Sequence, residues 1–253
     1  MNAIFEHYQM LGLPLSMLIM GTFLLAGMVK GVIGLGLPTV AMGLLGMAML
    51  PPQAAALLIV PSMVTNLWQL AFGGQLLLLL KRLWPMLLMV GIGTGLGGYG
   101  LGMSGGPGMT RALGAALLVY ALSGLFLPPL RLSAGHERWL GPVCGLTTGI
   151  ITAATGVFVI PAVPYLQALG LDRNQLVQAL GLSFTVSTSA LAMVLFFTGS
   201  LGGGEIGASL VALVPALLGM GIGQWLRQRI SAPMFKRAFF LGMGALGLHL
   251  LMG

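Results

Sequence analysis

Long stretches of this chain carry no charged residue, and this feature limits the possible folds more than any other. Residues 10–29, 32–80 and 174–204 are three such stretches. A helix of about 20 apolar residues crosses a bilayer core. Charged residues make up 6 % of the chain, against about 25 % in soluble proteins. The sequence therefore predicts an all-α polytopic membrane protein.

Glycine, proline and charged residues divide the chain into ten apolar stretches. They cover residues 11–29, 35–50, 53–72, 83–103, 112–127, 139–153, 156–170, 174–198, 206–225 and 238–252. Gly-rich breaks interrupt residues 11–50 and residues 139–170, and several of the pieces are too short to cross a bilayer. We expect broken or re-entrant helices at these two places.

The positive charges lie almost entirely on one side of this arrangement. Of the 11 Lys and Arg residues, all except Arg111 lie in odd-numbered connections between the stretches. The positive-inside rule places these connections in the cytoplasm and both termini outside. Because the cations form no continuous basic face, nucleic acid is not expected as a partner.

The two halves of the chain resemble each other. Each half carries a Gly-x-x-x-Gly pair, a Gly-rich break and a proline: Gly27, Gly31 and "GLGLP" (34–38) in the first, Gly145, Gly149 and "GVFVIP" (156–161) in the second. Five stretches per half is an odd number, so a second copy would be inverted in the membrane. We predict one membrane domain made of two inverted repeats, residues 1–130 and 131–253.

Inverted repeats with broken helices are typical of transporters, in which half-helix N-termini can bind an anion near the bilayer midplane. Glycine lets the backbone approach a ligand, and proline suits the first turn of a helix. The breaks provide six candidate binding residues: Gly34, Gly36, Pro38, Thr152, Thr155 and Gly156. The glycines could instead serve only close helix packing.

Lys30 is the cation next to the first break. The apolar stretch before it already has about membrane length, which favours a lysine that snorkels to the headgroups. In the alternative interpretation, Lys30 faces a cavity and attracts anions.

Polar side chains occur in register in the next pair of stretches. Ser62, Thr65, Asn66 and Gln69 share one helical face, and the corresponding face carries Thr185, Thr188 and Ser189. Such groups usually face the interior of a helix bundle. They could join helices or bind a polar solute, and the bulky amides of Asn66 and Gln69 favour the solute.

The four acidic residues map to the ends of stretches or to connections: Glu6, Glu137, Asp172 and Glu205. No carboxylate is therefore expected at membrane depth, which disfavours a cation carrier and a proton relay built on intramembrane acids. Histidines with metal-ligand spacing and a nucleophile–base pair are also missing from the sequence. We predict no catalytic residue, no metal site and no cofactor.

The segments "AGMVKGVIGLGLPTV" (26–40) and "GLTTGIITAATGVFVIPAVPYLQALGL" (145–171) resemble the sulfite exporter TauE/SafE family of membrane permeases. The resemblance extends over about residues 11–252. It implies a multi-pass transporter of the bacterial inner membrane that moves small anions such as sulfite, thiosulfate or sulfoacetate.

The residues predict a permease for a small anion, with the lipid bilayer as its surroundings, and the resemblance implies that this anion is a sulfur oxyanion or organosulfonate. A homo-oligomer is compatible with the sequence. A carrier of a non-sulfur organic anion and a non-transporting membrane assembly subunit are the alternatives.

Overall fold

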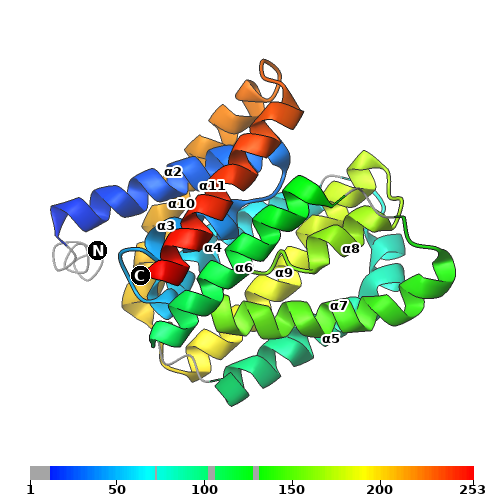
Figure 1. Ribbon diagram of the computed structural model, residues 1–253, viewed down its shortest axis with the longest axis horizontal. Coiled ribbons are helices and arrows are strands. Elements are labelled where there is room, and N and C mark those ends of the chain that lie inside the picture. The colour runs from blue at the N-terminus through cyan, green and yellow to red at the C-terminus, as the bar shows by residue number, and fades with distance from the viewer. Residues whose placement is uncertain (1–11, 72, 102–105, 128–130) are drawn as a thin grey trace.

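The computed structural model describes residues 12–71, 73–101, 106–127 and 131–253, and within them the chain forms ten α-helices and no strand. In chain order they are α2 (Leu13–Ile33), α3 (Leu37–Leu45), α4 (Pro51–Ala71), α5 (Leu76–Leu101), α6 (Pro107–Phe126), α7 (Ala134–Thr155), α8 (Ala162–Ala168), α9 (Arg173–Phe197), α10 (Gly203–Leu226) and α11 (Ala232–Met252). Figure 1 shows these helices packed as one bundle, with the short α3 and α8 among the long ones.

Each predicted apolar stretch corresponds to one of these helices. Seven helices are long and apolar enough to cross a membrane: α2, α4, α5, α6, α9, α10 and α11. The helix α7 has 22 residues but begins with polar and charged side chains, among them Glu137. The helices α3 and α8, with nine and seven residues, are too short to cross. The protein is an all-α polytopic membrane protein, as predicted.

Glycines allow α2 and α10 to pack with their backbones in contact. A Cβ added to Gly27 would lie 2.1 Å from the carbonyl oxygen of Ala216, and one added to Gly31 would lie 2.3 Å from that of Met220. Because the contacts advance together along both chains, the two helices run parallel. This is the close approach of small residues that stabilises helix pairs in membranes.

The helices α5 and α7 pack in the same way. A Cβ on Gly149 would lie 2.3 Å from the carbonyl oxygen of Val90, and one on Gly93 would lie 2.3 Å from that of Leu146. Gly93 belongs to a Gly-x-Gly-x-x-Gly sequence that has the spacing of a nucleotide-binding motif. Here this sequence lies inside a helix, where it serves helix packing and not phosphate binding.

Two further helix pairs run antiparallel. In α4 and α9, Asn66 bonds Thr188 while Leu70 lies next to Gly181, so one chain ascends as the other descends. In α6 and α11 the backbones of Gly114 and Gly247 touch. A two-fold axis that exchanges the members of an antiparallel pair must lie perpendicular to them. These pairs therefore support the predicted inverted repeat, with α2–α6 and α7–α11 as its halves.

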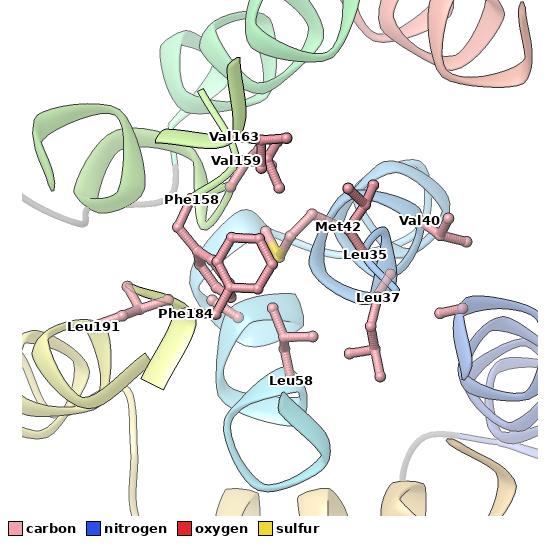
Figure 2. Close-up of a cluster of buried hydrophobic side chains, with 14 of the residues drawn as sticks. Leu35, Leu37, Val40, Met42, Leu58, Phe158, Val159, Val163, Phe184 and Leu191 are labelled. Carbon is pink, nitrogen blue, oxygen red and sulfur yellow. The ribbon is translucent and has the colours of Figure 1, made fainter. Parts of the chain in front are cut away.

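An apolar cluster fills the space between the two interrupted helices. It includes Met42 on α3, Phe158 after the second break and Phe184 on α9, all fully buried. Figure 2 shows these side chains converging from separate segments of the chain. The rings of Phe158 and Phe184 meet edge to face, with centroids 5.3 Å apart. The interior at this level is closely packed.

Candidate functional site

The first predicted interruption is present between α2 and α3. The helix α2 ends at Ile33, and Gly34 follows with a φ of +85° and its N–H bonded to the carbonyl of Lys30 at 2.7 Å. Gly36, with a φ of +109°, precedes the first turn of α3, which contains Pro38. Both positive φ values lie in the region that favours glycine, which explains why the chain breaks here.

Several backbone donors at this break have no acceptor among the residues that the structure describes. They are the N–H groups of Leu35, Gly36, Leu37 and Thr39. Leu35, Leu37 and Thr39 are buried. Buried N–H groups without a partner are uncommon, because each costs the free energy of a lost hydrogen bond. The break thus offers donors at the positive end of α3, where an anion is favoured.

Lys30 lies on the inner side of α2, just before this break. Its side chain is 3 % exposed. The Nζ donates to the Thr65 Oγ1 at 2.9 Å and to the Asn66 Oδ1, both on α4. The expectation that Lys30 snorkels to the headgroups is therefore wrong, because α4 covers the face of α2 from which this side chain projects.

The polar face predicted on α4 joins Lys30 to its surroundings. The Asn66 Nδ2 donates to the Thr188 Oγ1 on α9 at 3.3 Å, and the Gln69 Nε2 donates to the Gly34 carbonyl oxygen at the break. Ser62 lies one turn before Asn66 and is fully buried. The structure thus brings Lys30, Gly34, Ser62, Asn66, Gln69 and Thr188 together, with Thr65, in one connected region.

Two buried polar atoms of α4 in this network have no hydrogen-bond partner in the described part of the chain. They are the Ser62 hydroxyl and the amide oxygen of Gln69. The hydroxyls of Ser183 and Ser187 on α9 are also buried without a partner, but they share the face of α9 on which Val194 contacts Gly98 of α5. A hydroxyl can donate or accept, so the α4 side of the network retains polar capacity that the protein itself does not use.

Of the residues predicted on the polar face of α9, Ser189 points outward, and the half-buried Thr185 bonds within its own helix. The Ser189 hydroxyl donates to the Thr185 carbonyl at 2.9 Å and is exposed, and the Thr185 hydroxyl donates to the Gly181 carbonyl at 2.7 Å. Successive residues of a helix are about 100° apart, so Ser189 turns outward when Thr188 faces α4. The inward hydroxyls of α9 are instead those of Ser183, Ser187 and Thr188.

The second predicted interruption is also present, but protein atoms enclose it. The helix α7 ends at Thr155, and Gly156 has a φ of +70°. The Thr155 hydroxyl accepts from the Val157 N–H at 3.1 Å, and the Thr152 hydroxyl donates to the Thr148 carbonyl at 2.7 Å. A Cβ on Gly156 would lie 2.8 Å from the end of the Met42 side chain. These three predicted residues therefore lie apart from the Lys30 network.

The described part of the chain places no carboxylate in the Lys30 network. Glu137 and Glu205 lie in the first turns of α7 and α10, and Asp172 caps the start of α9. The amide and hydroxyl partners of Lys30 are neutral. Burying a charge is costly without a partner of opposite charge, so a protonated Lys30 lacks a counter-charge from the protein.

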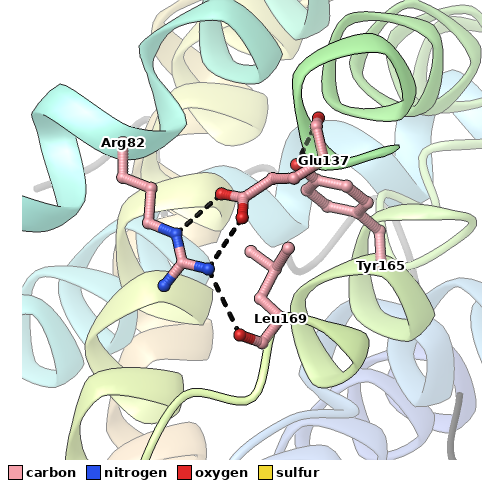
Figure 3. A network of polar contacts seen from close by, with 4 residues as sticks. All are labelled: Arg82, Glu137, Tyr165 and Leu169. Carbon is pink, nitrogen blue, oxygen red and sulfur yellow. Dashed lines mark hydrogen bonds and ion pairs between the residues drawn. The ribbon is translucent and has the colours of Figure 1, made fainter. Parts of the chain in front are cut away.

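The ion pair of the described residues lies elsewhere, between α5 and α7. The Arg82 Nε and Nη2 donate to the two carboxylate oxygens of Glu137 at 2.6 and 2.8 Å, as Figure 3 shows. The same Nη2 donates to the Leu169 carbonyl at 3.2 Å, and the Tyr165 hydroxyl donates to the Glu137 carbonyl at 3.3 Å. These contacts hold the segment around α8 against α5 and α7.

A cavity of about 330 Å³ reaches the first break. Ile33, Gly34 and Leu35 form part of its wall. Arg173, Arg227 and Lys236 also line it. By sequence these cations belong to two connections, and nothing in their spacing shows that both connections meet over the first break.

The family model described as sulfite exporter TauE/SafE matches residues 19–250 of the chain. The matched region contains both interruptions, the Lys30 network and the cavity. No curated protein and no solved structure shows significant similarity to the chain.

Proposed function

The chain belongs to the sulfite exporter TauE/SafE family, and from this membership we propose that it is a permease for a small sulfur-containing anion. Sulfite, thiosulfate and sulfoacetate represent the chemistry concerned. The anion binds at the first break, beside Lys30, and crosses without a covalent step. The seven long apolar helices support a lipid bilayer as its surroundings.

The observation that carries this proposal is the environment of Lys30. Its ammonium group is buried against neutral oxygens of Thr65 and Asn66. An anionic solute would supply the missing counter-charge, and a charge-assisted hydrogen bond would hold it. The free N–H groups at the start of α3 would bind the other side of the anion.

The apolar cluster around Met42 and Phe158 suits the closed side of such a carrier. Alternating access requires that a barrier separates the bound solute from one face while the other face is open. The cavity of about 330 Å³ lies on the open side in this conformation. We propose that the repeats formed by residues 1–130 and 131–253 rock against each other to move the barrier.

Within this proposal the second break belongs to the other state of the carrier. Gly156, Thr152 and Thr155 would become accessible when Met42 withdraws from Gly156. The charge distribution over the connections supports a cytoplasmic open side, both termini outside, and insertion in a bacterial inner membrane.

Two alternatives rest on the same residues. A carrier of non-sulfur organic anions would use the same cation and the same donors. A membrane assembly subunit would use the polar α4–α9 interface to hold helices together, with Lys30 as a structural donor. The unpaired hydroxyl of Ser62 and the unpaired amide oxygen of Gln69 favour a solute over this structural role.

Flux into proteoliposomes containing the purified full-length chain tests the proposal. We expect saturable uptake of sulfite, thiosulfate or sulfoacetate, and weaker uptake of acetate and malate. Faster uptake of malate or acetate than of any sulfur anion would favour the non-sulfur carrier. Flux equal to that of empty liposomes for all five anions would contradict transport.

A further inference from the structure

We propose that the cavity over the first break is an anion-collecting vestibule, a second binding region that is separate from Lys30 and precedes it on the transport path. Its cationic rim consists of Arg173, Arg227 and Lys236, and its inner wall includes Gly34 and Leu35. This inference rests on the proposed function for its role in transport. The electrostatic property itself does not depend on transport.

The three cations of the rim come from three different elements. Arg173 is the first residue of α9, Arg227 follows the last residue of α10, and Lys236 lies near the start of α11. Arg173 is distant in the sequence from Arg227 and Lys236, which flank the short connection between α10 and α11, yet all three residues line one cavity. The fold therefore concentrates positive charge at a single opening.

No carboxylate of the described residues neutralises this rim. The ion pair of the described residues joins Arg82 to Glu137, and neither residue lines the cavity. Asp172 precedes Arg173, but its carboxylate accepts the Gln175 N–H at 2.9 Å and so caps α9. The ammonium of Lys236 lies 5.6 Å from the centre of the Phe240 ring. The three cations of the rim outnumber the single carboxylate of Asp172, so the rim keeps a net positive charge.

The inner wall of the cavity connects the rim to the first break. The Leu35 N–H has no acceptor in the described chain, and the Gly34 carbonyl accepts a hydrogen bond from Gln69. Gln69 lies on the same face of α4 as Asn66, which bonds Lys30. An anion that enters past the rim therefore meets donors first and reaches the Lys30 network next.

The physical effect of such a rim is long-ranged and independent of exact fit. A cleft lined by one sign of charge raises the local concentration and the arrival rate of ions of opposite sign. Attraction grows with the charge of the ion, and about 0.1 M salt screens it beyond roughly 10 Å. The vestibule should therefore favour small anions with two charges over those with one, and lose this preference at high ionic strength.

Charged thiol reagents can measure this property without any transport assay. In a Cys144→Ala background, Gln167→Cys places a thiol on the cavity wall. The measured quantity is the rate of modification by a sulfonate-bearing methanethiosulfonate divided by the rate for its trimethylammonium analogue. We expect this ratio to be about tenfold higher for the cavity thiol than for free cysteine. Substitution of the rim by Arg173→Gln, Arg227→Gln and Lys236→Gln, or about 1 M salt, should remove this preference.

Arg229→Gln is the matched control. Arg229 lies in the same connection as Arg227, but its guanidinium stacks on the Trp225 ring at 4.1 Å and does not line the cavity. This change should leave the ratio of the two reagents within about twofold. With the rim unsubstituted, a reagent ratio equal to that of free cysteine would overturn the vestibule. So would an Arg229→Gln variant that lowers the ratio as much as the rim substitutions do. If the triple variant does not fold, the three single variants replace it, each with a partial loss.

Sulfite flux in proteoliposomes then separates the vestibule from the proposed function. Neutralising the rim should raise KM several-fold at low salt and leave kcat unchanged, because the rim acts on arrival and not on the rearrangement that moves the anion. If the rim variants transport sulfite with an unchanged KM, the vestibule is contradicted and the proposed function is not. No flux in the unsubstituted protein would contradict the proposed function, while the reagent ratio would still decide whether the cavity collects anions.

Discussion

Whether Lys30 is exposed at the headgroups or buried depends on the helix that packs over it. By sequence it ends an apolar stretch of membrane length, which is the usual place for a snorkelling lysine. In the structure it is 3 % exposed, because the helix α4 presents Thr65 and Asn66 to it. Position along a helix is a local property, whereas burial depends on a neighbour that lies 35 residues away in the chain.

Replacing Lys30 by methionine separates its functional role from a structural one. The side chain keeps a similar length and loses the charge, so sulfite flux in proteoliposomes should fall at least about tenfold, which corresponds to about 1.4 kcal/mol. The thermal unfolding midpoint in detergent should stay equal or rise, because replacing a buried charge by an apolar group is often neutral or stabilising.

The matched control is Lys81→Met, which removes an exposed lysine of α5. It should change neither flux nor unfolding. A Lys30→Met variant that unfolds several degrees lower and keeps its full flux would assign Lys30 a structural role and exclude it from the anion site.

At the scale of helices, the local signals in the sequence were reliable. Both breaks and the ten helices of the described residues follow from glycine, proline and charge positions, since these residues act on their own segment of backbone. The pairing of helices is a different matter. Each half carries a Gly-x-x-x-Gly pair before its break, and both pairs lie in close helix contacts, Gly27 with Ala216 and Gly149 with Val90. A Gly-x-x-x-Gly spacing repeats every turn, so it leaves the register one turn uncertain.

The close contact between α2 and α10 predicts a sharp difference between two glycines of α2. Gly27→Leu should lower stability by about 3 kcal/mol or more, because its Cβ alone would lie 2.1 Å from the Ala216 carbonyl oxygen and the two backbones would have to separate. Gly21→Leu should have little effect, because nothing lies within 4 Å of a Cβ there. Thermal unfolding in detergent and the yield of monodisperse protein measure both changes. Similar yields and midpoints for the two variants would contradict this packing.

For the molecule as a whole, composition alone predicted the fold class, because 57 % hydrophobic and 6 % charged residues suit a lipid environment. The candidate site was predicted in part. The break and the α4 face were recognised from their own residues, whereas the meeting of Arg173 with Arg227 and Lys236 at one cavity required the complete bundle. The antiparallel α4–α9 and α6–α11 pairs support the inverted repeat, and the membrane orientation stays a prediction.

Two single-cysteine variants in a Cys144→Ala background test this orientation. Ser200→Cys lies in an even-numbered connection and Ser133→Cys in an odd-numbered one. By the positive-inside rule, a membrane-impermeant maleimide should label the first variant in intact cells and the second only after permeabilisation. The reverse pattern would invert the protein in the membrane, and labelling of both variants in intact cells would contradict the predicted number of crossings between them.

The apolar cluster of Met42, Phe158 and Phe184 should also prevent protons from leaking through the protein. A polytopic protein with a continuous chain of water molecules through it would conduct protons and dissipate the proton gradient across the membrane. Close-packed aromatic and thioether groups exclude the water chain that such conduction needs. In the resting conformation the protein should therefore conduct protons no better than the surrounding lipid. The flexible thioether side chain of Met42 is the part of this barrier that can move most easily when an anion is transported.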